Sequence, residues 1–339
     1  MTRVRPAFLV AALCVLMAVL VGGAAPATGS RSSDPFGPGR TYAGDFPDPW
    51  VLRVGDTYYA YATNTANLNL PTMTSKDLQT WTAYGDAFPR AGGWARTQGI
   101  SGRSVSRTWA PSVTKVGDHF VLAYTAPLNR GGARKNCLGL ADADSPKGPF
   151  RDPHGSPMVC PSDQGAIDPQ VFVDQGKPYL LWKTEGRPGC CPTKFWTREL
   201  QADGTDFADG SDEHELLSTA LSWEGNVIEN PSLIRVNGLL YLFYSANEYV
   251  TDRYATGYAI CTSVTGPCQR PSSTPLIASG AGVAGPGGPA PFLGPDGQLR
   301  LAYAAWNPGQ IGYPRNQRRL HIARLAIDVD GLVHVTDRG

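Results

Sequence analysis

The chain has 339 residues, and its 30 Lys and Arg against 29 Asp and Glu give a formal net charge of +1. No run of Lys or Arg interrupts this balance, so the sequence argues against a nucleic-acid partner, which calls for a basic surface. The expected partner is neutral or small.

Residues 1–27 are predicted to be a secretory signal peptide. Arg3 and Arg5 precede an apolar run from Ala7 to Val21, and Ala25-Pro26-Ala27 supplies the small residues of a cleavage site. The run is short for a transmembrane helix, and nothing polar anchors its far side. We therefore expect a secreted protein that has no membrane segment once the peptide is removed.

The rest of the chain is predicted to be one all-β domain behind a linker. Residues 28–40 are rich in Gly, Ser, Pro and Arg, which is typical of a disordered linker. Residues 41–339 contain short runs of Val, Tyr, Phe, Trp and Leu between Gly, Asp and Asn turns. This pattern favours strands over helices.

A fivefold repeat emerges when the strand segments are aligned on one proline. The copies are "DPWVLRVGDTYYAYAT" at Pro49, "APSVTKVGDHFVLAYTA" at Pro111, "DPQVFVDQGKPYLLWKT" at Pro169, "NPSLIRVNGLLYLFYSA" at Pro231 and "APFLGPDGQLRLAYAAW" at Pro291. The intervals are 62, 58, 62 and 60 residues. Each copy supplies two strands around a Gly-containing turn, and roughly 40 further residues supply two outer strands. Five such units predict a five-bladed β-propeller with four-stranded blades.

Carboxylates occur at only some of the repeated positions. Asp48 and Asp168 directly precede their prolines, Glu229 lies one residue further back, and Ala110 and Ala290 occupy the other two copies. An acid needed only for a turn should recur in every blade. Because the inner strands should all begin at one end of the central channel, we expect the three acids to converge there. A general acid beside an ionised carboxylate is the requirement for glycoside hydrolysis.

Together these motifs resemble glycoside hydrolase family 43. The family's patterns are close to "FPDPWVLRVGDTYYAYAT", "WAPSVTKVGDHF", "IDPQVFVDQGKPYLLW" and "VIENPSLIRVNGLLYLFYS", in this order, and the resemblance runs from about Asp45 to Val335. It implies a five-bladed propeller that hydrolyses O-glycosyl bonds with inversion. Carried over by position, it implies Asp48 as general base, Asp168 as the residue that raises the acid's pKa, and Glu229 as general acid.

The resemblance also implies a substrate class. Family members of this type cleave α-L-arabinofuranosyl or β-D-xylosyl linkages in plant cell-wall polysaccharides, so the expected partner is an oligo- or polysaccharide. The alternative is a non-catalytic propeller that only binds carbohydrate. The presence of all three acids argues against that alternative.

Three further residues are candidates for binding the substrate. Trp109 should lie at the channel mouth, where a sugar ring can stack on its face, although core packing is the competing interpretation. Phe46 flanks Asp48. Arg319 or its neighbour Arg318 could supply the cation that some family members direct at the sugar, unless this is a solvated edge strand.

Two other acids compete with the assigned ones. Asp45 lies three residues before Asp48, but only Asp48 precedes the repeat proline. Glu224 lies five residues before Glu229 and is expected in the loop that leads into the strand.

The sequence departs from the family where a central ion would bind. Many members carry "GPGH", whose His helps to hold a calcium ion in the channel. Here the stretch is "AGPGGPAPF", with Gly288 at the His position. We therefore expect no required cofactor and no metal ligands, with a channel calcium left open as the alternative.

Six cysteines remain once Cys14 is removed with the signal peptide. An even number in an exported chain is typical of disulfides, and six cysteines allow 15 pairings. Closeness in sequence favours Cys137–Cys160 and Cys261–Cys268, which leaves Cys190 and Cys191 as an adjacent pair. A zinc site is the weaker alternative, because no His lies at ligand spacing near them.

Overall fold

The computed structural model describes residues 42–65, 67–100, 102–129, 135–187 and 190–339. The predicted signal peptide and linker lie outside these ranges. Within them, no helix is long and apolar enough to cross a membrane.

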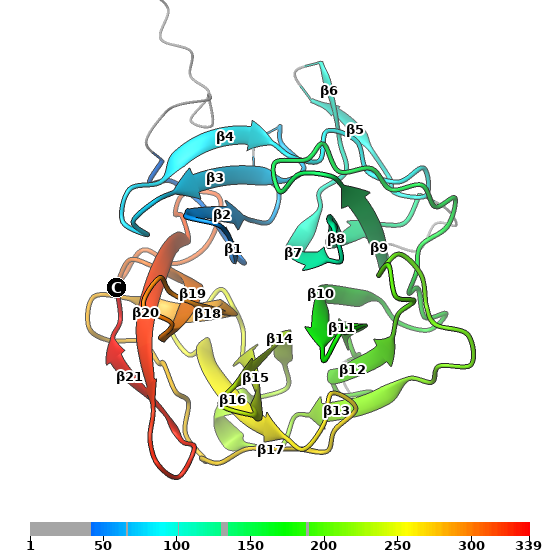
Figure 1. The fold of residues 1–339 in the computed structure, drawn as a ribbon. Coiled ribbons are helices and arrows are strands. Elements are labelled where there is room, and N and C mark those ends of the chain that lie inside the picture. The colour runs from blue at the N-terminus through cyan, green and yellow to red at the C-terminus, as the bar shows by residue number, and fades with distance from the viewer. Residues whose placement is uncertain (1–41, 66, 101, 130–134, 188–189) are drawn as a thin grey trace, which may run out of the picture. The chain divides into compact units, whose positions relative to one another are not determined.

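Five antiparallel sheets are arranged in a ring, each sheet forming one blade of a propeller (Figure 1). Blade one contains β1 (Trp50–Val54), β2 (Thr57–Tyr61), β3 (Pro71–Ser75) and β4 (Thr82–Asp86). Blade two contains β7 (Trp109–Val116), β8 (His119–Pro127) and β9 (Asn136–Ala143). Blade three contains β10 (Ala166–Asp174), β11 (Lys177–Thr184), β12 (Lys194–Glu199) and β13 (His214–Ser218).

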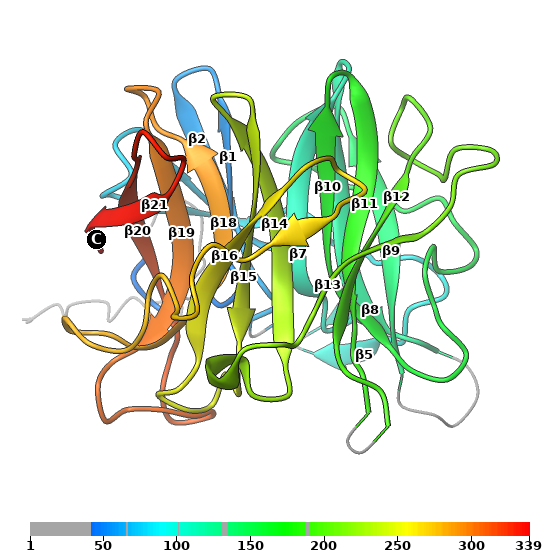
Figure 2. The same cartoon turned by 90° about the horizontal axis from the view of Figure 1, so that it is seen from below.

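The last two blades follow the same order. Blade four contains β14 (Ile228–Val236), β15 (Leu239–Ala246), β16 (Ala255–Cys261) and β17 (Cys268–Gln269). Blade five contains β18 (Ala284–Leu293), β19 (Leu299–Trp306), β20 (Arg319–Ile327) and β21 (Val333–Asp337). A hairpin of β5 (Gln98–Ile100) and β6 (Arg103–Val105) precedes blade two, and a 3-10 helix, Ser222–Glu224, precedes blade four. Figure 2 shows the blades from the side.

The predicted all-β, five-bladed fold is confirmed, with one local variation. Four blades have four strands in chain order, whereas blade two has three. Its outer edge is completed by single bridges, in which Asp142 of β9 pairs with Arg151 and Leu138 pairs with Val159.

Apolar side chains fill the space between every pair of neighbouring blades. Each of the five buried clusters contains residues of two neighbouring blades: Tyr61 and Val113, Val121 and Val171, Leu181 and Leu233, Phe243 and Leu301, and Phe292 and Tyr58. These are the aromatic and branched residues that pack well on pleated surfaces. The ring is therefore closed by side-chain packing between blades five and one, since β1 and β21 belong to different sheets.

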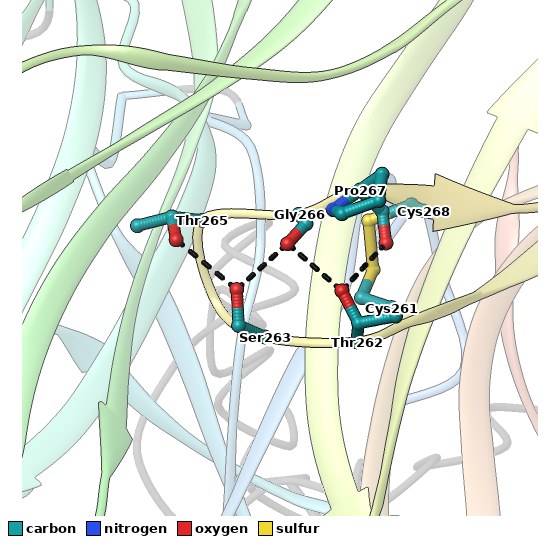
Figure 3. The surroundings of a disulfide bond; sticks show 7 residues. All are labelled: Cys261, Thr262, Ser263, Thr265, Gly266, Pro267 and Cys268. Atoms are coloured by element: carbon teal, nitrogen blue, oxygen red, sulfur yellow. Dashed lines mark hydrogen bonds between the residues drawn. A yellow bond between two sulfur atoms is a disulfide. The ribbon is translucent and has the colours of Figure 1, made fainter.

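All three predicted disulfides are present. Cys137–Cys160 ties β9 to the outer segment of blade two, and Cys190–Cys191 lies in the loop after β11, where it lines a separate cavity of about 410 Å³. Cys261–Cys268 joins β16 to β17 (Figure 3). In that turn the Thr262 and Ser263 hydroxyls both donate to the carbonyl of Gly266, at 2.9 and 2.7 Å.

The fifth copy of the repeat is shifted from its predicted register. The residue before the proline has a positive φ in every blade: 49° at Asp48, 39° at Ala110, 56° at Asp168, 53° at Asn230 and 68° at Gly288. The equivalent step in blade five is thus Gly288-Pro289, and Ala290-Pro291 lies two residues further along β18. The sequence alignment chose the wrong proline because β18 contains three of them and two irregularities in its pairing with β19.

Candidate active site

The five steps before proline meet at one end of the ring axis. Together with their prolines they line a narrow central cavity of about 30 Å³. A positive φ is costly for a residue with a side chain, and it persists where the surrounding structure imposes it. In blades two to five an irregularity in the ladder accompanies the step, between Trp109 and Ser112, Ile167 and Gln170, Glu229 and Ser232, and Gly287 and Ala290. Bulges of this kind redirect side chains next to functional sites.

A larger cavity of about 520 Å³ holds the three predicted carboxylates. Asp48, Asp168 and Glu229 all line it, from blades one, three and four. Their convergence is the arrangement that the irregular acids in the repeat predicted. The volume lies in the usual range for a small-molecule site.

Asp48 is held by two donors from different elements. The Thr63 hydroxyl donates to Oδ2 at 2.7 Å, and Arg318 donates from Nη1 to Oδ1 at 3.1 Å. The Thr63 oxygen in turn accepts the backbone N–H of Ala110 at 2.8 Å, which fixes the direction of its own proton. Asp48 is therefore oriented by blades one, two and five.

Arg318, not Arg319, supplies the cation of the site. The Arg318 side chain is 3% exposed, and its guanidinium lies 5.3 Å from the ring centroid of Tyr254. Burial alone would lower the pKa of Arg318, but Asp48 and the other acidic groups raise it above its usual value. Arg319 is exposed at the start of β20 and does not line the cavity, which corrects the expectation for it. Adjacent residues of an extended chain point to opposite sides.

Asp168 is buried and carries the raised pKa of the site. Its Oδ2 accepts the backbone N–H of Asn230 at 2.9 Å, and its own N–H donates to the Thr125 hydroxyl at 3.1 Å. Burial, followed by the negative charge of Glu229, raises the pKa of Asp168 to about 8, although Lys183 acts in the opposite direction.

Glu229 lies between two donors. The Tyr254 hydroxyl donates to Oε1 at 2.5 Å, and the Lys183 ammonium donates to Oε2 at 3.0 Å. Burial would raise the pKa of Glu229, but Lys183 and these hydrogen bonds outweigh it and hold the pKa below its usual value. The assignment of Glu229 as the general acid stays a prediction.

Tyr254 can reach Glu229 only because blade five has no side chain in the way. A Cβ built on Gly287 would lie 2.1 Å from Cε1 of the tyrosine ring. The ring is fully buried, and its hydroxyl also lies 3.0 Å from Oδ1 of Asn230. Gly287 is thus required by this close approach.

Of the two aromatic residues predicted to contact the substrate, Trp109 lines the cavity and Phe46 does not. Trp109 is 38% exposed and lines the larger cavity together with Tyr249. Phe46 is buried in the core between blades one and five, where it packs edge-on against Tyr42 with ring centroids 6.2 Å apart. It does not line the cavity, so its expected contact with the substrate is corrected.

The competing acids occupy different environments. Asp45 lines the larger cavity, where its Oδ1 accepts from the Tyr313 hydroxyl at 2.9 Å and from the N–H of Arg318 at 2.8 Å. Burial raises the pKa of Asp45. Glu224 lies away from the cavity and is fully buried beside Arg270, whose Nε lies 2.6 Å from its Oε1.

The channel residues do not fit the calcium site implied by the resemblance. Position 288 is a glycine with a φ of 68°, and a Cβ there would lie 3.0 Å from Cα of Asp48, so a His at this position would require the neighbouring backbone to shift. Among the described residues, no group of three or more His, Cys, Asp or Glu is placed to hold a metal ion.

Sequence reasoning missed Lys183, Tyr254 and Tyr249. Lys183 did leave a signal, because it is the one charge within the apolar run "YLLWK" of an inner strand. The two tyrosines lie in the loop after β15, and no feature of the sequence around them distinguished them from other aromatic residues.

The geometry agrees with comparisons to known proteins. The family described as "Glycosyl hydrolases family 43" matches residues 41–333. An arabinoxylan arabinofuranohydrolase from Bacillus subtilis (strain 168) is 32% identical over 200 residues, which cover 54% of this chain and 36% of the relative. This match thus spans little more than a third of that relative.

Two further proteins match over most of their own length. A probable arabinan endo-1,5-alpha-L-arabinosidase A from Aspergillus flavus is 27% identical over 295 residues, covering 80% of this chain and 85% of the relative. The crystal structure of a thermostable family-43 glycoside hydrolase superposes with a TM-score of 0.74 at 28% identity, covering 89% of this chain and 96% of that one. The chain belongs to glycoside hydrolase family 43 and is an enzyme that hydrolyses glycosidic bonds.

Proposed function

We propose that this enzyme cleaves α-L-arabinofuranosyl or β-D-xylosyl linkages of plant cell-wall polysaccharides by a single inverting displacement. The observation that carries the proposal is the meeting of Asp48, Asp168 and Glu229 at one cavity. The substrate class is supported by the relatives, one named for arabinoxylan and another for arabinan.

In the proposed reaction, Asp48 accepts a proton from a water molecule whose oxygen attacks the anomeric carbon. The bond from that carbon to the glycosidic oxygen breaks, and its electron pair goes to the oxygen. Glu229 donates a proton to this oxygen, so that an alcohol leaves. Asp48 ends protonated and Glu229 ionised, and exchange with solvent resets both.

The surrounding residues orient these groups. Arg318 and Thr63 fix the Asp48 carboxylate, and the repulsion between the charges of Asp168 and Glu229 tunes the proton affinity of Glu229. Trp109 and Tyr249 offer exposed rings on which a sugar can pack. No cofactor takes part in this proposal.

We further propose that the enzyme is exported. The basic and apolar order of the first 27 residues supports export, and so do the three disulfides, which persist in oxidising compartments.

The first test is hydrolysis of a chromogenic α-L-arabinofuranoside and a chromogenic β-D-xyloside. The second is nuclear magnetic resonance of the sugar that is first released from a natural oligosaccharide, which identifies its anomer. We expect cleavage of at least one glycoside and an inverted anomer. Failure on both sugar classes would refute the substrate proposal, and a retained anomer would refute the mechanism.

A further inference from the structure

A second cavity lies beside the proposed acid, between blades three and four. It has a volume of about 410 Å³ and is lined by the loop after β11, the segment between β13 and β14 and the loop after β15. Its lining residue Val227 is two residues before Glu229, and its lining residue Glu248 is next to Tyr249, which lines the larger cavity. Two residues of extended chain span roughly 7 Å, so the two cavities are neighbours at the same end of the propeller.

This second cavity is on the side of the proposed acid rather than of the proposed base. Its walls come from blades three and four, which carry Asp168 and Glu229, whereas Asp48 is held by blades one, two and five. In an inverting hydrolase the acid faces the leaving group, and the base faces the water on the opposite side of the sugar. A sugar in the second cavity would therefore belong to the leaving group.

The Cys190–Cys191 disulfide forms one wall of the second cavity. Its two cysteines are adjacent, so the bond closes no loop of chain, whereas the other two disulfides join residues 23 and 7 positions apart. In the chain-entropy account, a disulfide stabilises a fold by restricting the unfolded chain, and the effect grows with the length of the closed loop. Stabilisation of this kind does not explain the Cys190–Cys191 bond, and its place on the cavity wall suggests a role in binding.

Backbone hydrogen bonds hold this disulfide in place. The N–H groups of Cys190 and Cys191 donate to the carbonyl of Arg187 at 3.2 and 3.1 Å, and the N–H of Arg187 donates to the carbonyl of Cys191 at 2.8 Å. Cys190 is exposed and Cys191 is half-buried. The pair thus offers a fixed surface of polarizable sulfur on which the C–H groups of a sugar can pack.

Polar groups with unused hydrogen-bonding capacity surround this surface. Among the described residues, no hydrogen bond involves the lining side chains of Thr219, Asn226 and Glu248. The buried Thr193 hydroxyl accepts the N–H of Ile228 at 2.8 Å but donates to no described acceptor. A buried donor without an acceptor costs free energy, which a bound hydroxyl group would offset. An apolar surface with a few polar groups around it is the usual composition of a small-molecule site.

We propose that the second cavity is a subsite for a sugar unit of the leaving group, which packs on the Cys190–Cys191 disulfide. This rests on the proposed function, because the role of Glu229 defines the leaving-group side. The lining charges are of mixed sign, Glu185 and Glu248 against Arg187, and favour an uncharged ligand over an ion. The occupant is therefore a neutral sugar unit of the polysaccharide, and a monosaccharide glycoside has no unit that reaches this subsite.

Kinetics on a long and a short substrate test the proposal. In the double variant Cys190→Ala/Cys191→Ala, KM for a long arabino- or xylo-oligosaccharide should rise about fivefold. KM and kcat for a chromogenic monosaccharide glycoside should keep their wild-type values, which also shows that the variant is folded. Thr219→Val, which removes one unused hydroxyl, should raise the same oligosaccharide KM by a smaller factor. An unchanged oligosaccharide KM in the double variant, or equal rises for both substrates, would overturn the proposal.

The double variant Cys261→Ala/Cys268→Ala is the matched control. This disulfide joins β16 to β17 at the outer edge of blade four and lines neither cavity. Its removal should leave both KM values unchanged at a temperature where the protein is folded. A rise in the oligosaccharide KM as large as that in Cys190→Ala/Cys191→Ala would assign the effect to the loss of any disulfide and overturn the proposal.

Binding without turnover separates the two proposals. Glu229→Gln protein is titrated with the oligosaccharide in a calorimeter, with and without the Cys190→Ala/Cys191→Ala change, and Kd should rise about fivefold when the disulfide is lost. Equal Kd values would overturn the subsite and leave the proposed function standing. Wild-type protein that hydrolyses no glycoside would overturn the proposed function, whereas the titration would still show whether the oligosaccharide binds at the disulfide.

Discussion

Arg318 and Asp48 form an ion pair that joins blade five to blade one, with 3.1 Å between Nη1 and Oδ1. The backbone carbonyl of Arg318 also accepts the N–H of Phe46 at 2.7 Å, two residues before Asp48. The same residue thus helps to close the ring and to orient the proposed base.

Replacement of Arg318 should therefore impair catalysis. We expect Arg318→Met to lower kcat/KM on the order of 10²-fold, because small displacements of a reacting group have effects of that size. Arg319→Met is the control, since its side chain is exposed on β20, and it should keep the wild-type rate. Equal losses in both variants, measured by steady-state kinetics, would contradict the assignment of Arg318.

Trp109 should contribute mainly to substrate binding. Its exposed ring at the cavity wall gives a sugar an apolar face, so we expect Trp109→Ala to raise KM roughly three- to tenfold and to change kcat less. Tyr84→Ala is a matched control, because Tyr84 is 40% exposed but belongs to β4 and does not line the cavity. A fall in kcat with an unchanged KM would argue against stacking.

Asp168 should make the stability of the enzyme depend on pH. Its pKa is about 8 in the folded protein, against 3.8 for a free side chain, so between these values the folded state binds more protons than the unfolded state. The contribution of this group to the free energy of unfolding is then greatest below about pH 4 and decreases as the pH rises toward 8.

Asp168→Asn should remove this dependence. Thermal unfolding at several pH values should show that the stability of the variant increases relative to that of the wild type as the pH rises from 4 to 8. Asp163→Asn, at an exposed position, controls for the change in charge. A constant difference between wild type and Asp168→Asn over this range would mean that Asp168 is not protonated in the folded protein.

Chelation should leave the reaction unaffected. Gly288 occupies the position of the calcium-binding His that the resemblance implies, so that ligand is missing from this channel. We expect prolonged treatment with a chelator to keep the rate of glycoside hydrolysis unchanged. Loss of activity that added Ca²⁺ restores would show that the ion is held by other groups.

The repeat predicted the fold and the convergence of the three acids because both leave a pattern within short stretches of the sequence. A proline, a turn and an aromatic strand recur at nearly equal spacing, and Asp48, Asp168 and Glu229 stand out against that background. The error at Ala290 has a physical cause, since the long β18 offers three prolines and only a backbone φ distinguishes the true step.

The supporting residues were harder to predict. Arg318 and Arg319 are adjacent in sequence, and only the path of the chain into β20 decides which of them turns inward. Phe46 is equally close to Asp48 along the chain but packs into the core between blades. Tyr254 depends on the absence of a side chain at Gly287, in another blade. Such contacts between distant segments leave no local pattern.

The most direct test of the central claim is Glu229→Gln assayed on two substrates. On a natural oligosaccharide, whose leaving group needs a proton, kcat/KM should fall about 10²- to 10⁴-fold. On an aryl glycoside with a good leaving group the loss should be much smaller, because that group departs without a proton. Equal losses on both substrates would contradict the assignment of Glu229 as the general acid.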